Sequence, residues 1–285
     1  MKKCLLIIIV VCLAACQKDF DEVEDTNQRH IDFLIDTGNL LSDVLFSQSN
    51  TFWLGVTDSI TSAHRVRVSA YCYDATGNLV ASQHHIVPSL GQTTITFRHL
   101  LKQTSYHFVF LADVVRTDEH LDYQETWYQL ATKHRNTAYL FSNEMSKSVV
   151  ENILKYAATD VEPSNQAVSV TLQPATYNGY IVLTHTDDVF KLNGTYGYSA
   201  SLSTEGLTTR KSATSSFVSF YSNGTDALWP VTLTKNDTTL QFSLDVSTST
   251  NGLQSLTEEV SIDQRRPFVV FFDCSSLSIT DVKYY

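Results

Sequence analysis

The chain has 285 residues, including 20 Lys or Arg and 30 Asp or Glu, which gives a formal net charge of −10 at pH 7. This length is sufficient for two domains of roughly 100–150 residues, each with its own hydrophobic core. The acidic balance and the lack of clustered Lys and Arg in the sequence argue against binding to phosphate backbones, so we expect no nucleic-acid partner.

The N-terminus has the pattern of an export signal. Two lysines precede an apolar run over residues 5–11, which is too short to span a bilayer at about 1.5 Å rise per residue. The run is followed by Leu13-Ala14-Ala15-Cys16, which resembles a bacterial lipobox. The resemblance implies that residues 1–15 are a lipoprotein signal peptide and that Cys16 becomes the first mature residue and carries lipid such as palmitate. The alternative is an ordinary signal peptide in which a cysteine occurs by chance.

Residues 16–30 are expected to form a flexible acidic tether. The stretch QKDFDEVEDT carries five acids and one lysine and has little apolar surface to bury. A lysine followed by acids just behind the lipid cysteine also resembles the signal that sends lipoproteins of Bacteroidales-type bacteria to the outer face of the outer membrane. The resemblance implies a lipid-anchored protein that faces the cell exterior, and a plain spacer is the alternative.

Residues 31–158 are expected to form a first β-domain. The side chains of residues 65–73 alternate between an apolar face (Val66, Val68, Ala70, Cys72) and a second face (Arg67, Ser69, Tyr71, Tyr73). Asp74-Ala75-Thr76-Gly77-Asn78 supplies turn residues, so the sequence predicts a hairpin over residues 65–82. Further strands are predicted at residues 94–97 and 106–115, the second being an almost continuous apolar run typical of a sheet centre.

Two parts of this domain have mixed patterns. Residues 33–56 contain short apolar clusters that favour short strands, although residues 39–46 also fit one or two helical turns. Residues 146–156 fit a short helix with Ser146 or Ser148 as its N-cap. We therefore expect short helical insertions in a β-domain.

A second β-domain is expected over residues 159–285, after a polar linker at residues 157–166 (AATDVEPSNQ). Asn-Gly pairs that begin at Asn178, Asn193, Asn223 and Asn251 each stand between short β-rich runs. The runs are residues 168–172, 180–184, 196–202, 217–221, 240–246, 256–262 and 268–273. Many short strands separated by turn signals predict a β-sandwich of antiparallel neighbours.

Two cysteines, Cys72 and Cys274, remain in the expected folded body. An oxidising compartment would permit a disulfide between them. Each lies in an alternating apolar strand pattern, however, and we assign them to different domains. The sequence therefore predicts two buried, unpaired thiols.

The sequence contains no nucleophile elbow, zinc-protease motif, phosphate-binding loop or Cys-x-x-Cys pair, so we expect no enzymatic activity, cofactor or metal. The neighbours His84 and His85 would point to opposite faces of a strand, so they cannot chelate one ion without a bulge. The stretch His185-Thr186-Asp187-Asp188 lacks the glycine and closing glutamate of a calcium loop, which favours a solvated turn over a calcium site.

Exposed aromatic side chains would serve a glycan-binding face as stacking platforms. The candidates are Trp53, Trp127, Tyr128, Trp229 and the pair Tyr71 and Tyr73. Core packing or interface burial explains the same residues equally well, and both interpretations stay open at this point.

Several of these features together resemble the fimbrillin superfamily of Bacteroidales, in particular its lipid-anchored anchor and accessory subunits. They are the lipobox, the acidic tether, "VRVSAYCYDATGNLVAS", "ITFRHLLKQTSYHFVFLADV" and "QAVSVTLQPATYNGYIVLT". Asp74, Gly77 and Leu79 match the family's turn pattern after the first alternating strand, whereas Thr104 or Ser105 stands where the family usually has a glycine. The resemblance implies two tandem transthyretin-like β-sandwich domains.

The resemblance also implies that the protein anchors or decorates a fimbria and binds fimbrial shaft or accessory subunits by β-strand addition. A glycan or a host surface is a further possible partner. We expect the N-terminal region to be retained, because cleavage in the tether, for instance at Arg29, would release the protein from its membrane. Residues 278–285 fit either a docking strand for a partner or a strand that completes its own sheet.

Two other functions remain as alternatives. A glycan-binding surface lipoprotein that works beside a nutrient importer would share the lipobox, the tether and the tandem sandwiches. A hydrolase is the least favoured alternative, because no acid–base constellation occurs in the sequence.

Overall fold

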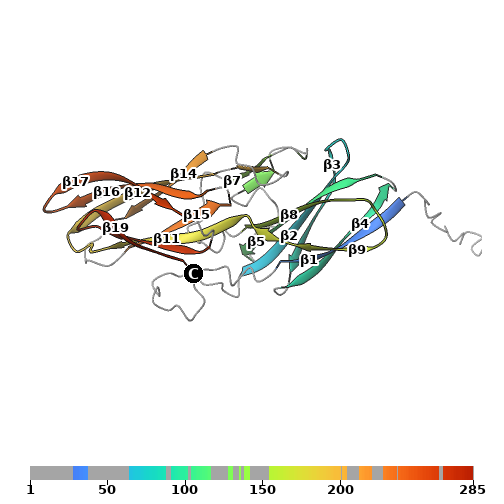
Figure 1. Ribbon diagram of the computed structural model, residues 1–285, viewed down its shortest axis with the longest axis horizontal. Coiled ribbons are helices and arrows are strands. Elements are labelled where there is room, and N and C mark those ends of the chain that lie inside the picture. Colours follow the sequence, from blue (N-terminus) through green and yellow to red (C-terminus); the bar gives the residue numbers. More distant parts are fainter. Residues whose placement is uncertain are drawn as a thin grey trace, which may run out of the picture.

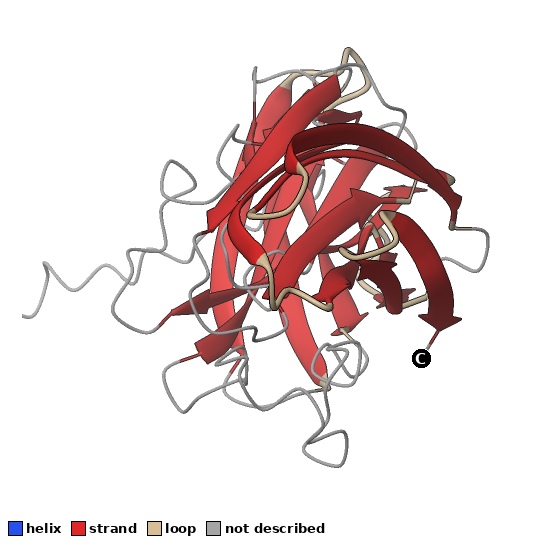
Figure 2. Ribbon diagram, turned by 90° about the vertical axis from the view of Figure 1, so that its left-hand side faces the viewer, coloured by secondary structure: helices blue, strands red, loops and turns tan. Residues whose placement is uncertain are grey.

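A computed structural model describes residues 28–37, 64–87, 91–101, 104–116, 128–130, 135, 138–141, 154–199, 201–203, 212–219, 227–235, 237–262 and 266–284. Every regular element in these ranges is a β-strand, which confirms the all-β class (Figure 2). The expected helical insertion at residues 146–156 is wrong at its end, because Leu154 begins a strand, and its remaining residues lie outside the described ranges. The described residues accordingly include no helix with the length and hydropathy needed to cross a membrane.

The strands form two β-sandwiches placed end to end (Figure 1). They are β1 (Gln28–Asp36), β2 (His64–Tyr73), β3 (Leu79–Val87), β4 (Gln92–Leu101), β5 (Tyr106–Arg116), β6 (Tyr128–Leu130), β7 (Ala138–Phe141), β8 (Leu154–Val161), β9 (Ala167–Thr171), β10 (Gln173–Pro174), β11 (Thr176–Thr184), β12 (Val189–Ser199), β13 (Ser201–Ser203), β14 (Ser212–Ser219), β15 (Ala227–Thr234), β16 (Thr239–Thr248), β17 (Gly252–Ser261), β18 (Phe268–Asp273) and β19 (Ser278–Tyr284).

The first sandwich packs a three-stranded sheet, in the order β4-β1-β9, on a five-stranded sheet, in the order β10-β8-β5-β2-β3. Phe33 of β1 lies at the centre of the core, with ring centroids 6.3, 4.6 and 4.9 Å from those of Phe97, Phe108 and Phe110. All four rings are buried, and such aromatic contacts stabilise a core beyond the area that they remove from water. β5 lies between β8 and β2, which confirms its predicted central position.

The predicted first hairpin is confirmed: β2 and β3 pair antiparallel around the Asp74–Asn78 turn. Asp74 Oδ1 accepts hydrogen bonds from the backbone N–H groups of Thr76 and Asn78, each at 2.9 Å. Gly77 has φ 87°, a left-handed conformation that glycine adopts without a Cβ clash. The sequence DATGN therefore fixes the register of the hairpin.

The second sandwich consists of the sheets β15-β11-β18-β19 and β14-β12-β16-β17. Trp229 of β15 is the largest side chain of its core and lies edge-on to Tyr196 and Phe242. Most neighbours are antiparallel, as expected, but β1 pairs parallel with β9 and β11 pairs parallel with β18. Each sandwich thus has one parallel pair formed by strands far apart in the chain.

The expected domain boundary between residues 158 and 159 falls inside β8, and the expected linker at residues 157–166 begins with strand residues. β9 and β10 follow that boundary, yet they pair with β1 and β8 of the first sandwich. The chain passes to the second sandwich at Ala175, next to β11. The low hydrophobicity of residues 157–166 reflects the exposed half of β8 and the turn after it, rather than a linker.

Two of the expected Asn-Gly turns are wrong, because Asn178-Gly179 lies inside β11 and Asn193-Gly194 inside β12. Each glycine makes room for an aromatic ring, which belongs to the neighbouring strand β18 in the case of Gly179 and to β15 of the facing sheet in the case of Gly194. A Cβ on Gly179 would lie 2.5 Å from Phe268, and one on Gly194 would lie 2.6 Å from Trp229. Asn251-Gly252 does stand at a turn, where Gly252 has φ 67°, and Asn223-Gly224 lies outside the described residues.

The two sandwiches share one continuous set of buried residues. Side chains on the outer face of the five-stranded sheet, such as Tyr71 and Leu111, belong to the same hydrophobic cluster as Trp229 and Phe268. A small third sheet adds backbone pairing across the junction, because β7 from the first half of the chain pairs with β13 from the second half. The junction is therefore a packed interface rather than a flexible hinge.

Candidate functional site

Both ends of the long axis are candidate attachment points. β1 begins at the end of the first sandwich that is remote from the second (Figure 1). At the opposite end, three connections meet: residues 185–188, 249–251 and 274–277. Their position follows from the register, since Thr184 pairs with Asp273 and Val189 pairs with Thr248. We call these three connections the distal loops.

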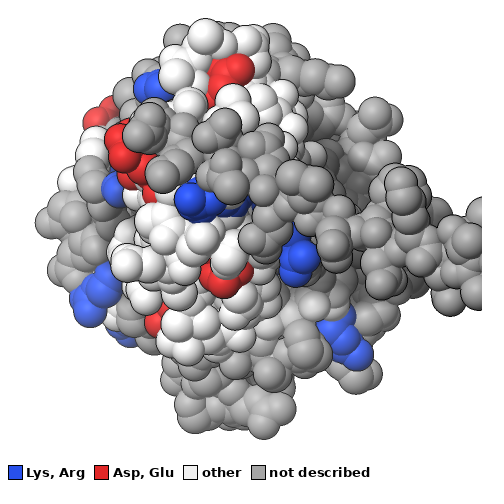
Figure 3. All heavy atoms as spheres, turned by 90° about the vertical axis from the view of Figure 1, so that its right-hand side faces the viewer, with Lys and Arg blue, Asp and Glu red and all other residues white. Residues whose placement is uncertain are grey.

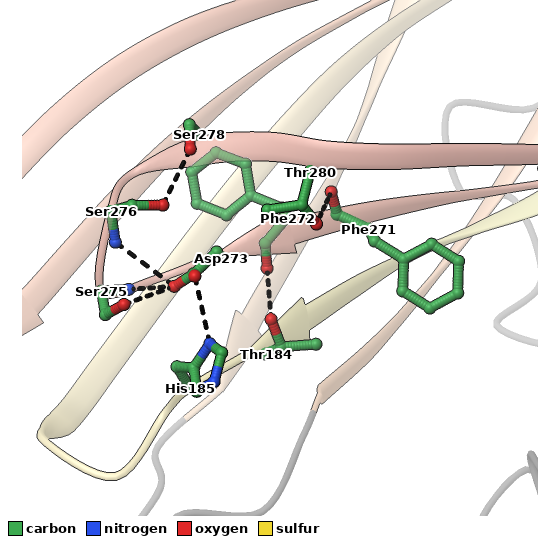
Figure 4. Close-up of polar contacts among 9 residues, drawn as sticks. All are labelled: Thr184, His185, Phe271, Phe272, Asp273, Ser275, Ser276, Ser278 and Thr280. Atoms are coloured by element: carbon green, nitrogen blue, oxygen red, sulfur yellow. Dashed lines mark hydrogen bonds and ion pairs between the residues drawn. The ribbon is translucent and has the colours of Figure 1, made fainter.

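Asp273 organises one of the distal loops (Figure 4). Its Oδ1 accepts hydrogen bonds from Ser275 Oγ at 2.6 Å and from the backbone N–H groups of Ser275 and Ser276 at 2.7 and 3.3 Å. Its Oδ2 lies 3.1 Å from His185 Nδ1 of the neighbouring loop. The Ser275 hydroxyl, followed by the backbone donors and His185, lowers the pKa of Asp273 to about 2.

Asp188 ties the first and second of these connections together, residues 185–188 and residues 249–251. It accepts hydrogen bonds from the Ser249 hydroxyl, from Thr250 Oγ1 at 2.6 Å and from the Thr250 backbone N–H at 3.2 Å. These donors, the Ser249 hydroxyl first, lower the pKa of the exposed Asp188 carboxyl. Of the two carboxylates in the stretch considered as a calcium site, Asp188 is thus engaged by hydroxyl and amide donors, and no group of three metal-ligating side chains occurs in the described ranges.

The Asp273 turn predicts a pH-dependent contribution to stability. A carboxyl group with a lowered folded pKa stabilises the fold above its unfolded pKa near 3.8, and this contribution disappears as the pH falls through about 2. We expect Asp273→Asn to destabilise the protein by about 1 kcal/mol at pH 6, because the turn is at the surface, and to have little effect near pH 2.

Thermal unfolding of both proteins between pH 6 and pH 2 measures this difference. Asp187→Asn, at an exposed position of the adjacent loop, is the matched control and should have no effect at either pH. A constant difference between wild type and Asp273→Asn over the whole pH range would contradict the assignment.

The described aromatic candidates do not form a stacking platform. Trp229 is 1% exposed, Tyr71 is 2% exposed and Tyr73 is fully buried, so all three serve the core. Trp53 and Trp127 lie outside the described residues, and of Tyr128 only the backbone is described, in β6. The core interpretation is thus the right one for the three residues whose side chains are described.

The structure supports the predictions that His84 and His85 lie on opposite faces of a strand and that Cys72 and Cys274 are unpaired. On β3, the His84 ring lies 6.2 Å from that of Tyr71, whereas His85 Nε2 lies 3.2 Å from Gln83 Oε1. Cys72 and Cys274 are free and buried in different sandwiches, which confirms the predicted unpaired thiols. Burial, together with the charge of Asp74, raises the pKa of Cys72 to about 12, so this thiol is not a nucleophile.

The C-terminal strand completes its own sheet. β19 pairs antiparallel with β18, and Ile279, Val282 and Tyr284 pack against the core of the second sandwich. Tyr284 donates a hydrogen bond to the Ser261 carbonyl at 3.1 Å, which links β19 to β17 of the opposite sheet. β19 is an edge of its sheet, and strand edges accept further strands.

The surface at the β1 end carries charges of both signs. In the coloured part of Figure 3, Lys and Arg side chains are interspersed with Asp and Glu side chains. Sequence reasoning identified residues 185–188 as a turn but did not bring this turn together with residues 249–251 and 274–277, because the contacts that join them link residues far apart in the chain. Cys16, the expected lipidation site, lies outside the described residues.

No protein-family model and no curated protein sequence matches the chain. Among solved structures, the fold is similar to that of the fimbrial anchor protein Mfa2 from Porphyromonas gingivalis, with a TM-score of 0.52 and 11% identity over 90% of this chain and 98% of that one. A candidate adhesin from Bacteroides thetaiotaomicron gives a TM-score of 0.52 and 12% identity over 90% of this chain and 95% of that one. A candidate polysaccharide-binding protein from the same organism gives a TM-score of 0.53 and 12% identity, with the same coverage.

Proposed function

We propose that this protein is a non-enzymatic cell-surface lipoprotein that anchors or decorates a fimbria. The observation that carries this proposal is the fold shared with the anchor Mfa2 over 98% of that chain, including both sandwiches. The lipobox-like sequence that ends in Cys16 supports attachment to the outer membrane through lipid, with the folded body outside the cell. Residues 1–15 would then be the signal peptide. The tether, expected over residues 16–30, would end at residue 27 instead, because the first sandwich begins with β1 at Gln28 and not at residue 31.

The integration of β1 into the first sandwich supports retention of the N-terminal region. Ile31, Phe33 and Ile35 of this strand are fully buried, and its backbone pairs on both sides. The backbone of Arg29 pairs with Leu100, so an arginine-directed protease would have to extract the start of β1 before it cleaved there. A retained β1 keeps the folded body joined to Cys16.

Cys16→Ser tests the membrane attachment. In cells that express this variant, we expect fimbriae and the protein itself to appear in the medium instead of on the cell, because the lipid is absent. Quantitative blotting of cell and medium fractions, with metabolic palmitate labelling of the wild type, measures both effects. Wild-type protein without palmitate, or normal retention of the variant, would contradict the anchoring proposal.

The edge of β19 is the surface at which we propose that a fimbrial subunit adds a strand. The test uses soluble protein that starts at Gln17, with Asp281→Cys labelled by a bulky maleimide after folding. Asp281 is about half exposed, so the label should block the edge without disturbing the core. Glu259→Cys on β17, the edge of the other sheet, is the matched control. Equal capture of shaft subunits by both labelled proteins would exclude β19 as the docking edge.

A glycan-binding lipoprotein beside a nutrient importer is the second candidate function. It is favoured by the fold shared with the candidate polysaccharide-binding protein. Trp229 cannot carry such binding from the core, so calorimetric titration of the whole mature protein with polysaccharides is the appropriate test. Saturable binding together with normal fimbriae in cells that lack the protein would favour this candidate over the first.

A further inference from the structure

We propose that β1 is a mechanical clamp, which transmits tension along the long axis of the molecule by loading its two strand ladders in shear. β1 is the first described strand, so force applied through the preceding chain reaches the described fold at Gln28. The relevance of this clamp rests on the proposed function, in which the N-terminus is fixed to a membrane and a partner pulls on the second sandwich.

The direction of the strands sets the direction of the load. β1 pairs parallel with β9, from Asp32 beside Ala167 to Asp36 beside Thr171. β9 continues through β10 directly into β11 of the second sandwich. In Figure 1, β1 starts at the right-hand end of the first sandwich, and the chain after β9 leads to the second sandwich on the left. Tension therefore pulls β1 and β9 in opposite directions along their common axis.

Two ladders resist this movement together. On its other side, β1 pairs antiparallel with β4 over its whole length, from Gln28 beside Leu101 to Asp36 beside Gln92. When a strand is pulled along its own axis, its ladder hydrogen bonds carry the load at the same time. When it is pulled sideways from one end, they break one after another. The rupture force depends on the barrier to unfolding along the pulling direction. This barrier is higher when all hydrogen bonds of a ladder must break together, so β1 should withstand a larger force in shear than in peeling.

Polar contacts fasten both ends of β1. At its start, the His30 backbone N–H donates to Asn165 Oδ1 at 3.2 Å, and the His30 carbonyl accepts from the Asn165 N–H at 3.2 Å. Asn165 has φ 56°, a left-handed conformation that asparagine tolerates better than most residues. At its end, the Asp36 carbonyl accepts from the Leu172 N–H at 3.0 Å, and Thr37 donates to the Gly91 carbonyl through both N–H and Oγ1.

The side chains of β1 oppose extraction as well. Ile31, Phe33 and Ile35 point into the core and are fully buried, each with 0% solvent-accessible surface. In shear, Phe33 must leave its ring contacts with Phe97, Phe108 and Phe110 in one step, and Ile31 and Ile35 must leave the same hydrophobic cluster with it. Buried apolar side chains and ladder hydrogen bonds thus both oppose extraction of β1, the strand that follows the proposed tether.

Single-molecule pulling on soluble protein that starts at Cys16 tests the clamp. One DNA handle is attached to Cys16 and the other to an introduced cysteine, and the buried Cys72 and Cys274 stay unlabelled in the folded protein. In the shear arrangement the second handle is at Gln173→Cys, just after the C-terminal end of β9. In the matched peeling arrangement it is at Ala167→Cys, at the N-terminal end of the same strand. Both positions are exposed.

We expect the force that detaches β1 to be about three-fold higher in the shear arrangement than in the peeling arrangement, although the same strands separate. Asn165→Gly, which removes the side-chain bond to His30 but tolerates the positive φ, should lower the shear force. Equal forces in the two arrangements, or detachment of β9 before β1, would overturn the proposal. The measurement uses neither lipid nor a fimbrial partner, so a result that rejects the clamp leaves the proposed anchoring function untouched, and the two proposals are tested separately.

Discussion

Replacement of Asp113 by alanine is expected to destabilise the protein by about 3–5 kcal/mol, the largest effect that we predict for a single polar residue. Asp113 of β5 pairs directly with Arg67 of β2. Arg67 Nε donates to Asp113 Oδ1 at 3.0 Å and Arg67 Nη2 donates to Oδ2. The two side chains are 0% and 3% exposed. Without the carboxylate, the buried guanidinium keeps its desolvation cost and loses its bidentate partner.

Chemical denaturation at 25 °C measures this effect, and two controls separate its causes. The double variant Arg67→Met/Asp113→Leu, which removes both charges, should be much closer to wild type than Asp113→Ala is, since apolar replacement of a buried pair is often neutral. Asp281→Ala breaks the exposed pair with Lys283, at 3.5 Å, and should cost less than about 1 kcal/mol. If Asp113→Ala costs no more than Asp281→Ala, the buried pair does not have the role described.

Arg67 also illustrates what a strand pattern predicts and what it leaves open. Alternation correctly places Val68 and Cys72 on one face of β2 and Arg67, Tyr71 and Tyr73 on the other. The polar residues in this second set suggest a solvent-facing surface. In the structure, the second face is buried as well, because it joins the hydrophobic cluster of the second sandwich. A period of two residues identifies which side chains share a face, but not what covers that face.

Local turn chemistry and long apolar runs were the most predictive signals. The DATGN turn and the central strand 106–115 both form as expected, since residues close in sequence determine them. The domain boundary, the parallel partner of β1 and the distal loops depend on contacts between residues far apart in the chain. A single sequence does not specify such contacts, and this explains why β9 was assigned to the second domain although it pairs with β1.

The Asn-Gly pairs show the same limit at the scale of one residue. An Asn-Gly pair between β-rich runs is a strong hairpin signal, and it is correct at Gly252, where φ is positive. Gly179 and Gly194 lie in the middle of strands, where their lack of a side chain serves packing against Phe268 and Trp229. Glycine meets both requirements, so its presence alone does not distinguish a turn from a close approach to a ring.

Gly194→Ala is therefore expected to destabilise the second sandwich by about 1–3 kcal/mol. At an unhindered strand position the same substitution would stabilise the protein by about 0.4–1 kcal/mol, because alanine restricts the unfolded chain. Here the new methyl group would lie 2.6 Å from Trp229 Cζ3 and 3.1 Å from Leu244 Cδ2. Both neighbours belong to the core and are 1% exposed, so neither can move away without disturbing it.

Equilibrium denaturation of four proteins tests this prediction: wild type, Gly194→Ala, Trp229→Leu and the double variant. If the clash with the indole ring causes the loss, Gly194→Ala should cost at least about 1 kcal/mol less in the Trp229→Leu background, which leaves space for the methyl group. Thr195→Ala, at the exposed neighbouring position of β12, is the control for changes in strand propensity and should shift stability by less than about 0.5 kcal/mol. A stabilising Gly194→Ala, or an equal loss in both backgrounds, would show that the approach of Trp229 does not require glycine at this position.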